Sequence, residues 1–129
     1  MEKEALRKMG QDSPYFRHLD MELLEAEDGY AKVMQGVIHG GAIASLADQA
    51  AMRAAQTRLI PGQIGKTIQM DMHYLAPARG KHLIGEGHVR KMGKRVAFSD
   101  GEVKDEKGRM VAIARCTIMI LENESEEGG

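Results

Sequence analysis

Two features of this sequence have residue types and a spacing that suit chemistry at a carbonyl carbon. The first is His39-Gly40-Gly41, which lies where a strand-like region gives way to an alanine-rich helix. Backbone N–H groups at a helix start have no intrahelical acceptor, and with the helix dipole they attract negative charge. Glycines allow close approach to these groups, which suits the oxyanion formed in acyl transfer. Alone, a Gly-Gly helix start is more often turn chemistry.

The second feature is Asp48, inside the alanine-rich helix. Its helical neighbours three and four residues away include no cation: they are Ala44, Ser45, Ala51 and Met52. A carboxylate in apolar surroundings is costly unless it has partners or a task, and such surroundings raise its pKa and make it a better base. The alternatives are a partly exposed polar position or a carboxylate satisfied by another strand.

The spacing of the two groups constrains how they could act together. Gly41 and Asp48 are seven residues apart, which is roughly 10 Å along a helix. One helix can hardly direct both groups at the same carbonyl, whereas two helices related by a twofold axis can. The spacing therefore predicts a dimer with two sites, in which the amide of one subunit meets the carboxylate of the other.

The hydrophobic pattern predicts the elements that must position these residues. In order, they are a short helix at 2–9, strands at 19–27 and 30–34, a helix from 40 to about 59, and strands at 67–75, 82–90, 95–104 and 109–121. The long helix is small and apolar on nearly every side, which predicts that it is enclosed. One buried helix and about six strands predict an α+β fold in which an antiparallel sheet wraps around the helix.

Several local expectations follow from the same pattern. Alternation over 67–75 places Ile68, Met70, Met72 and Tyr74 on one face of a strand. Ser13-Pro14 predicts the start of a turn, and Asp28-Gly29 predicts a hairpin. Two glycines within one strand, Gly85 and Gly87, suggest a bulge or bend. The single cysteine, Cys116, stands in an apolar run and is expected to be a buried small hydrophobe.

Length and composition limit the classes of function. The 129 residues predict one domain, 1–129, with an acidic, disordered tail from about 122 to 129. A net charge of −1 does not point to nucleic acid or an anionic membrane. The charged N-terminus is no signal peptide, and the single cysteine fits a cytoplasmic protein. The scattered histidines lack metal-ligand spacing, so no metal is expected.

The stretch from His39 to Asp48 closely resembles the signature of hotdog-fold thioesterases of the phenylacetate-degradation type, in which HGG is followed after six residues by Asp. The run 65–78 is similar to the next strand of that family, and 93–95 to its basic hairpin. The resemblance covers roughly residues 18–121. It implies a hotdog fold, a cytoplasmic acyl-CoA thioesterase with no cofactor beyond its CoA substrate, and usually a tetramer of two dimers.

The resemblance also implies roles for individual residues. The amide of Gly41, with that of Gly40, would polarise the thioester carbonyl, and His39 would support the loop. Asp48 from the other subunit would act as general base on water or as nucleophile. Thr67 matches a position where the family often has a Ser or Thr that helps to place the water.

Two positions depart from the family pattern. Val33 stands where the family often has an asparagine, so a second contact to the carbonyl oxygen is lost. This loss keeps an alternative function open, a non-catalytic acyl-CoA binding or sensing protein. Thr67 falls by strand parity with Gln69, Asp71 and His73, so it faces inward only if the strand bends or begins late.

A basic cluster at one predicted turn contains Arg90, Lys91, Lys94 and Arg95. It could hold the phosphates of CoA by charge-assisted hydrogen bonds, or it could be a solvated hairpin. Charge alone favours the solvated hairpin, whereas with the resemblance the two interpretations are equally supported. The acyl group itself is not specified by the sequence. Ten methionines against two phenylalanines suit a core that adapts to flexible acyl chains, or reflect a preference of the lineage.

Overall fold

The computed structural model of the chain describes residues 14–36 and 40–122. It contains α2 (Pro14–His18), β1 (Met21–Glu27), β2 (Tyr30–Gln35), α3 (Gly40–Gln56), β3 (Gln63–Tyr74), β4 (Leu83–Met92), β5 (Val96–Asp105) and β6 (Met110–Glu122). The predicted helix at 2–9 lies outside these residues, as does the tail beyond Glu122, which itself still belongs to β6. Pro14 opens a helix instead of the predicted turn, since its fixed φ suits a first helical position.

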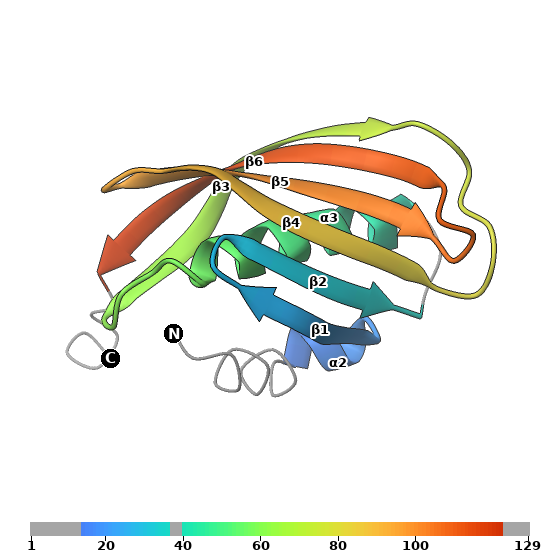
Figure 1. Ribbon diagram of the computed structural model, residues 1–129, viewed down its shortest axis with the longest axis horizontal. Coiled ribbons are helices and arrows are strands. Elements are labelled where there is room, and N and C mark those ends of the chain that lie inside the picture. The colour runs from blue at the N-terminus through green and yellow to red at the C-terminus, as the bar shows by residue number, and fades with distance from the viewer. Residues whose placement is uncertain (1–13, 37–39, 123–129) are drawn as a thin grey trace.

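The six strands form one antiparallel sheet in the order β1-β2-β4-β5-β6-β3. Figure 1 shows the sheet curving around α3, which lies on its concave side, while α2 lies beside β1. The predicted α+β layout, with an antiparallel sheet wrapped around one long helix, is confirmed. The predicted hairpin at Asp28-Gly29 is also present, and Gly29 takes the positive φ of 76° that this turn requires.

The central helix is enclosed, as its small residues predicted. Six of its alanines are buried: Ala42, Ala47, Ala50, Ala51, Ala54 and Ala55. One buried cluster joins α3 to β1, β2, β4 and to Phe16 of α2. A second cluster joins the C-terminal half of α3 to β5 and β6, and it contains Cys116 and Ile118. These two clusters hold α3 against the full width of the sheet.

Glycines in β4 and β5 let the helix approach the sheet closely. A Cβ atom on Gly87 would lie 2.0 Å from the carbonyl oxygen of Ala50, and one on Gly101 would lie 2.2 Å from that of Ala47. Of the bulge or bend predicted at Gly85 and Gly87, the bulge is absent, because both residues pair regularly with neighbouring strands. Their lack of a side chain serves the close contact with α3, and the irregularity in β4 falls at Arg90.

A β-bulge changes the direction of side chains along β3. Thr67 pairs with Ile118 and Gln69 pairs with Thr117, so Ile68 is an extra residue. The bulge turns Thr67 inward, while Met70 and Met72 beyond it still pack against the core. The predicted apolar face is therefore correct for these two methionines. It is wrong for Ile68, the extra residue of the bulge, which is 55% exposed. Tyr74 keeps the alternation and shares the face of the two methionines, but it lies beyond the core and is 56% exposed.

The sheet has two edges, and one of them is the long strand β3. It pairs with β6 on one side only, so its other side carries main-chain groups without a neighbouring strand among the described residues. Exposed apolar side chains lie along and just beyond this strand: Ile68, Tyr74 and Leu75. Such an edge is suited to pairing with another strand. No helix among residues 14–36 and 40–122 has the length and apolar character needed to cross a membrane.

Candidate active site

Asp48 lies in the middle of α3, on the side that faces β3 and β6. Its carboxylate is half-buried, and its Oδ1 accepts a hydrogen bond of 2.7 Å from the hydroxyl of Thr67. The sequence leaves open whether Asp48 is exposed or has a partner on another strand. The structure shows the second arrangement, with Thr67 of β3 as the partner. Thr67 reaches it because the bulge at Ile68 reverses the parity of the strand. This hydrogen bond joins two residues that are nineteen positions apart in the sequence.

The glycine pair lies at the start of the same helix. Gly40 is the first residue of α3 and Gly41 is exposed in its first turn, so the structure places both where backbone N–H groups lack intrahelical partners. His39 lies outside the described residues. Since α3 is a continuous helix, Gly41 and Asp48 are roughly 10 Å apart along its axis. Within one chain, therefore, the two groups do not meet at one carbonyl.

Val33 and Gln35 show what stands in the region where the family often has an asparagine. Val33 is fully buried and pairs with Gly85, so it packs in the core and offers no polar group. Gln35, two residues on, is also fully buried. Its Nε2 donates to the carbonyl oxygen of Leu19 at 3.0 Å, and its Oε1 has no hydrogen-bond partner within the part of the chain that the structure describes.

Cys116 on β6 is a neighbour of Asp48 that the sequence did not indicate. Its Sγ lies 4.0 Å from Oδ1 of Asp48. The side chain is fully buried, as predicted, and burial together with the charges of Asp48 and Asp100 raises the pKa of the thiol to about 12. Strand pairing brings the thiol here: Cys116 lies opposite Met70 of β3 and opposite Ser99 of β5, whose hydroxyl bonds to α3. No local pattern could have revealed that pairing.

The predicted basic cluster is divided between two places. Arg90 is the extra residue of the bulge in β4, and its Nε lies 2.7 Å from Oδ2 of Asp100 on β5. Lys91 is exposed within β4. Lys94 and Arg95 instead line a hollow of about 620 Å³ at the end of the sheet. The remaining lining residues are Ile60, Gln63, Ile120, Leu121 and Glu122.

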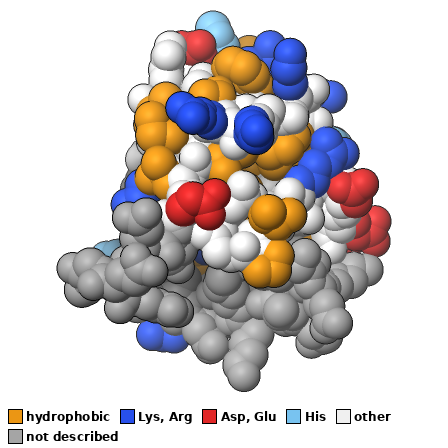
Figure 2. Space-filling view, turned by 90° about the vertical axis from the view of Figure 1, so that its left-hand side faces the viewer, with side chains coloured by type: hydrophobic (Ala, Val, Ile, Leu, Met, Phe, Trp, Pro, Cys, Tyr) orange, Lys and Arg blue, Asp and Glu red, His pale blue; other side chains and the backbone are white. Residues whose placement is uncertain are grey.

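The hollow beside Lys94 and Arg95 combines cationic and apolar walls. Figure 2 views this end of the molecule and shows Lys and Arg side chains among hydrophobic ones. The hollow begins at Gln63, the first residue of β3, which is four residues before Thr67. At the rise of a β-strand this separation is roughly 13 Å. Two of the four predicted basic residues therefore line a hollow that β3 connects to the surroundings of Asp48.

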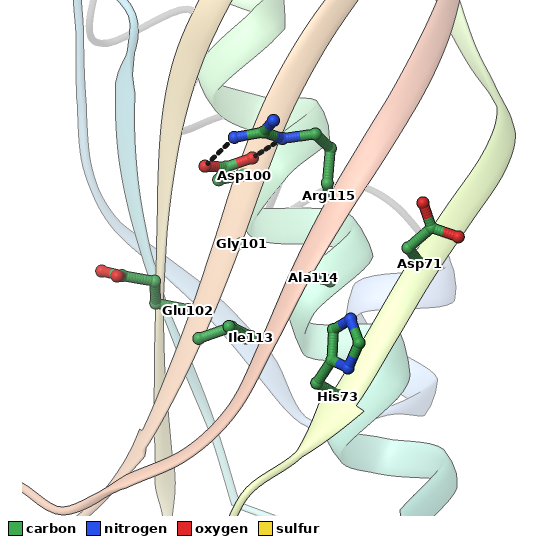
Figure 3. Close-up of a pocket in the computed structure, with 8 residues that line it drawn as sticks. All are labelled: Asp71, His73, Asp100, Gly101, Glu102, Ile113, Ala114 and Arg115. Carbon is green, nitrogen blue, oxygen red and sulfur yellow. Dashed lines mark hydrogen bonds and ion pairs between the residues drawn. The ribbon is translucent and has the colours of Figure 1, made fainter.

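A second hollow, of about 320 Å³, lies on the outer face of the sheet. Figure 3 shows its side chains on the far side of β3, β5 and β6 from α3. Asp100 accepts hydrogen bonds from Arg115 there, and Arg115 with Arg90 holds the pKa of its carboxyl below the usual range. Because the sheet separates this hollow from Asp48, it is not part of the candidate site. Among the residues that the structure describes, no cluster of three or more His, Cys, Asp or Glu could hold a metal ion.

Comparison with known proteins identifies the family. The model of the thioesterase superfamily matches residues 35–112, which include α3 and Asp48. A protein of Archaeoglobus fulgidus is 31% identical over 121 residues, covering 85% of this chain and 77% of that protein. The medium/long-chain acyl-CoA thioesterase YigI of Escherichia coli is 26% identical, covering 92% of this chain and 95% of YigI.

Solved structures share the fold. A thioesterase family protein from Silicibacter pomeroyi has a TM-score of 0.85 at 18% identity, covering 93% of this chain and 98% of that one. The PaaI protein of the E. coli phenylacetic acid degradation operon has a TM-score of 0.79 at 22% identity, covering 88% of each chain. The chain therefore belongs to the thioesterase superfamily and has the hotdog fold, as its resemblance to the phenylacetate-degradation type implied. It is a hydrolase of thioester bonds.

Proposed function

We propose that this enzyme hydrolyses a small to medium acyl- or aryl-CoA thioester to the free acid and CoA. The observation that carries this proposal is the half-buried carboxylate of Asp48, held by Thr67 in an otherwise small and apolar stretch of helix. Asp48 acts on water as a general base, or attacks the thioester directly. The amides of Gly41 and Gly40 stabilise the oxyanion, with His39 supporting their loop. The acyl-CoA thioesterase activity named for YigI supports the substrate class.

The proposed site is completed by a second copy of the chain. Asp48 and Gly41 are too far apart on α3 to act on one carbonyl, whereas twofold-related helices bring one of each together. The unpaired edge of β3 lies beside Asp48 and is suited to pairing with the same edge of the partner. This arrangement makes two sites per dimer, each with the carboxylate of one subunit and the amides of the other.

The nucleotide end of CoA is proposed to lie at the hollow beside Lys94 and Arg95. Their charges suit its phosphates, and the hollow is roughly 13 Å from Thr67 along β3. The extended arm that joins the thioester to the phosphates can span such a distance. Arg90 has a smaller part in this proposal than the sequence implied, because Asp100 already engages it. Lys91 is exposed and free to contribute to the charge.

The first test replaces Asp48 with Asn or Ala and follows thiol release from a panel of acyl- and aryl-CoA esters. We expect kcat to fall at least about 100-fold, as for loss of a general base. Asp71→Asn is the matched control, because it removes an equal charge from the outer face of β3, and it should leave kcat unchanged. Full activity of the Asp48 variants would refute the mechanism.

The sequence also leaves open acyl-CoA binding without catalysis, because Val33, which is buried and apolar, stands in place of a polar partner. The thioesterase family and the acyl-CoA thioesterase activity named for YigI favour hydrolysis over this alternative. The same panel separates it from hydrolysis. If the unaltered protein binds CoA esters in calorimetry but hydrolyses none of them, the binding function is correct.

The shared site is tested by mixing two inactive variants. Asp48→Ala removes the carboxylate. Gly41→Pro removes the backbone N–H of that residue, in a first helical turn that tolerates proline. After unfolding and refolding an equal mixture, half of the dimers contain one subunit of each kind. Each of these has one intact site, so about a quarter of the original activity should return. No recovery would mean that each subunit carries a complete site.

The nucleotide site is tested with two substrates that share an acyl group. Lys94→Ala and Arg95→Ala should raise KM for the acyl-CoA but not for the corresponding acyl-pantetheine, which lacks the nucleotide. Arg90→Ala is the control that removes a cation already paired with Asp100. Equal effects on both substrates would place the CoA phosphates elsewhere.

A further inference from the structure

The carboxylate of Asp48 is held through one of its two oxygens. The Thr67 hydroxyl lies 2.7 Å from Oδ1, and Cys116 Sγ lies 4.0 Å from the same atom. The two donors come from different strands, β3 and β6. Within residues 14–36 and 40–122, no hydrogen bond to Oδ2 is found. The two oxygens of Asp48 are therefore in different environments.

The thiol of Cys116 remains protonated near neutral pH and can act as a donor. Its side chain is fully buried, and burial is the main cause that raises its pKa to about 12. The titratable groups that add to this shift are Asp48 on α3 and Asp100 on β5, and both disfavour a thiolate. Because the thiolate is the reactive form of cysteine, these groups make Cys116 a weak S–H donor and not a nucleophile.

We infer that Cys116 is a positioning residue for thioester hydrolysis, which together with Thr67 fixes Oδ1 of Asp48 and leaves Oδ2 as the working oxygen. The inference rests on the proposed function of Asp48. In the general-base route, Oδ2 takes a proton from water while the water oxygen bonds to the carbonyl carbon. The C–S bond then breaks with its electron pair on sulfur, and the proton passes from Oδ2 to that sulfur, which gives the acid and CoA.

The physical reason for two donors is orientation. A single hydrogen bond leaves a carboxylate free to turn about its Cβ–Cγ bond, whereas donors on two strands restrict the plane of the group. Removing the Cys116 donor should therefore lower kcat and leave KM nearly unchanged, because the orientation of the carboxylate matters to the reaction and not to binding of the thioester.

The experiment compares Cys116→Ala and Cys116→Val with Cys116→Ser, measuring kcat and KM separately at one pH. We expect the Ala and Val variants to lower kcat by about 3- to 10-fold while KM changes by less than about twofold. The Ser variant keeps a donor and should recover at least half of the lost kcat. The Val variant retains buried volume and provides the result if the Ala variant does not fold.

The control is Ile118→Val, which removes a methylene from the buried cluster that contains Cys116. The Ile118 side chain has no donor, so this change removes no hydrogen bond to Asp48. It should lower the thermal midpoint while leaving kcat unchanged, as a purely structural effect would. An unchanged kcat in the Ala or Val variant, no recovery of kcat in the Ser variant, or an equal loss of kcat in Ile118→Val overturns the inference. Asp48→Asn tells the two failures apart: if it is inactive while the Cys116 variants behave as the parent, the proposed function stands and only this inference fails.

Discussion

Replacing Gly101 with alanine should weaken both stability and catalysis through a single displacement. The new Cβ would lie 2.2 Å from the carbonyl oxygen of Ala47, a main-chain atom that no side-chain rotation can move, whereas ordinary contacts begin at 3.4 Å. The helix must therefore retreat from β5 by about 1 Å, against well-packed neighbours. Overpacking of this kind costs about 2 kcal/mol or more, which corresponds to a fall in Tm of at least about 6 °C.

Because Ala47 precedes Asp48, the same displacement moves the carboxylate relative to Thr67. A displacement of about 1 Å at a reacting group can lower kcat about 100-fold. Gly65→Ala is the matched control, since its new Cβ would meet only side-chain atoms, of Ile118 and Met52, at 3.1 Å or more and no main-chain atom. Thermal unfolding and steady-state kinetics on both variants give the answer. If Gly101→Ala matches Gly65→Ala in Tm and kcat, the contact of α3 with β5 does not position Asp48.

Three further outcomes are expected. Arg53→Met should leave Tm unchanged or raise it, because this buried guanidinium has no carboxylate partner among the described residues and its Nε lacks a hydrogen bond; a fall of more than about 6 °C would contradict this. Asp100→Asn should lower Tm at pH 7, with the difference shrinking at acidic pH. Arg115 and Arg90 hold the pKa of this carboxyl below 3.8, so its stabilisation is present above that value and is lost as pH falls through the lowered pKa; a difference independent of pH would contradict it. Cys116 should react with a disulfide reagent at least about 100-fold more slowly in the native protein than in urea, because burial raises its pKa to about 12; similar rates would show that the thiol is accessible.

The hydrophobic pattern was sufficient to predict the layers of the fold. A helix made of small residues had to be enclosed, and the strands around it had to alternate. The pattern failed where one residue is added to a strand. The bulge at Ile68 reverses the facing of side chains, so Thr67 faces Asp48 although simple alternation placed it outside. Bulges depend on the pairing of two strands, which periodicity within one strand does not contain.

The site was predictable to the extent that its residues lie close together in sequence. The His39-to-Asp48 spacing located the helix and its carboxylate. The sequence predicts one basic cluster because its four members are close together in the chain. In the structure, Arg90 pairs with Asp100, whereas Lys94 and Arg95 line the hollow. Cys116 was missed as a neighbour of Asp48, because a contact across 68 residues depends on how β6 pairs with its neighbours and packs against α3, which no local pattern contains.

The two sides of α3 differ in how much sequence change they can absorb. Toward β4 and β5, the helix backbone rests against Gly87 and Gly101, and almost any side chain there would displace it. Toward β3 and β6, the contact is made by flexible side chains, including Met52 of the helix and Met70 of β3. Divergence toward new substrates, in nature or in a directed library, should therefore accumulate on the β3 side, while the glycine side stays fixed. A library restricted to β3 and its helix neighbours would sample new specificities with few unfolded clones.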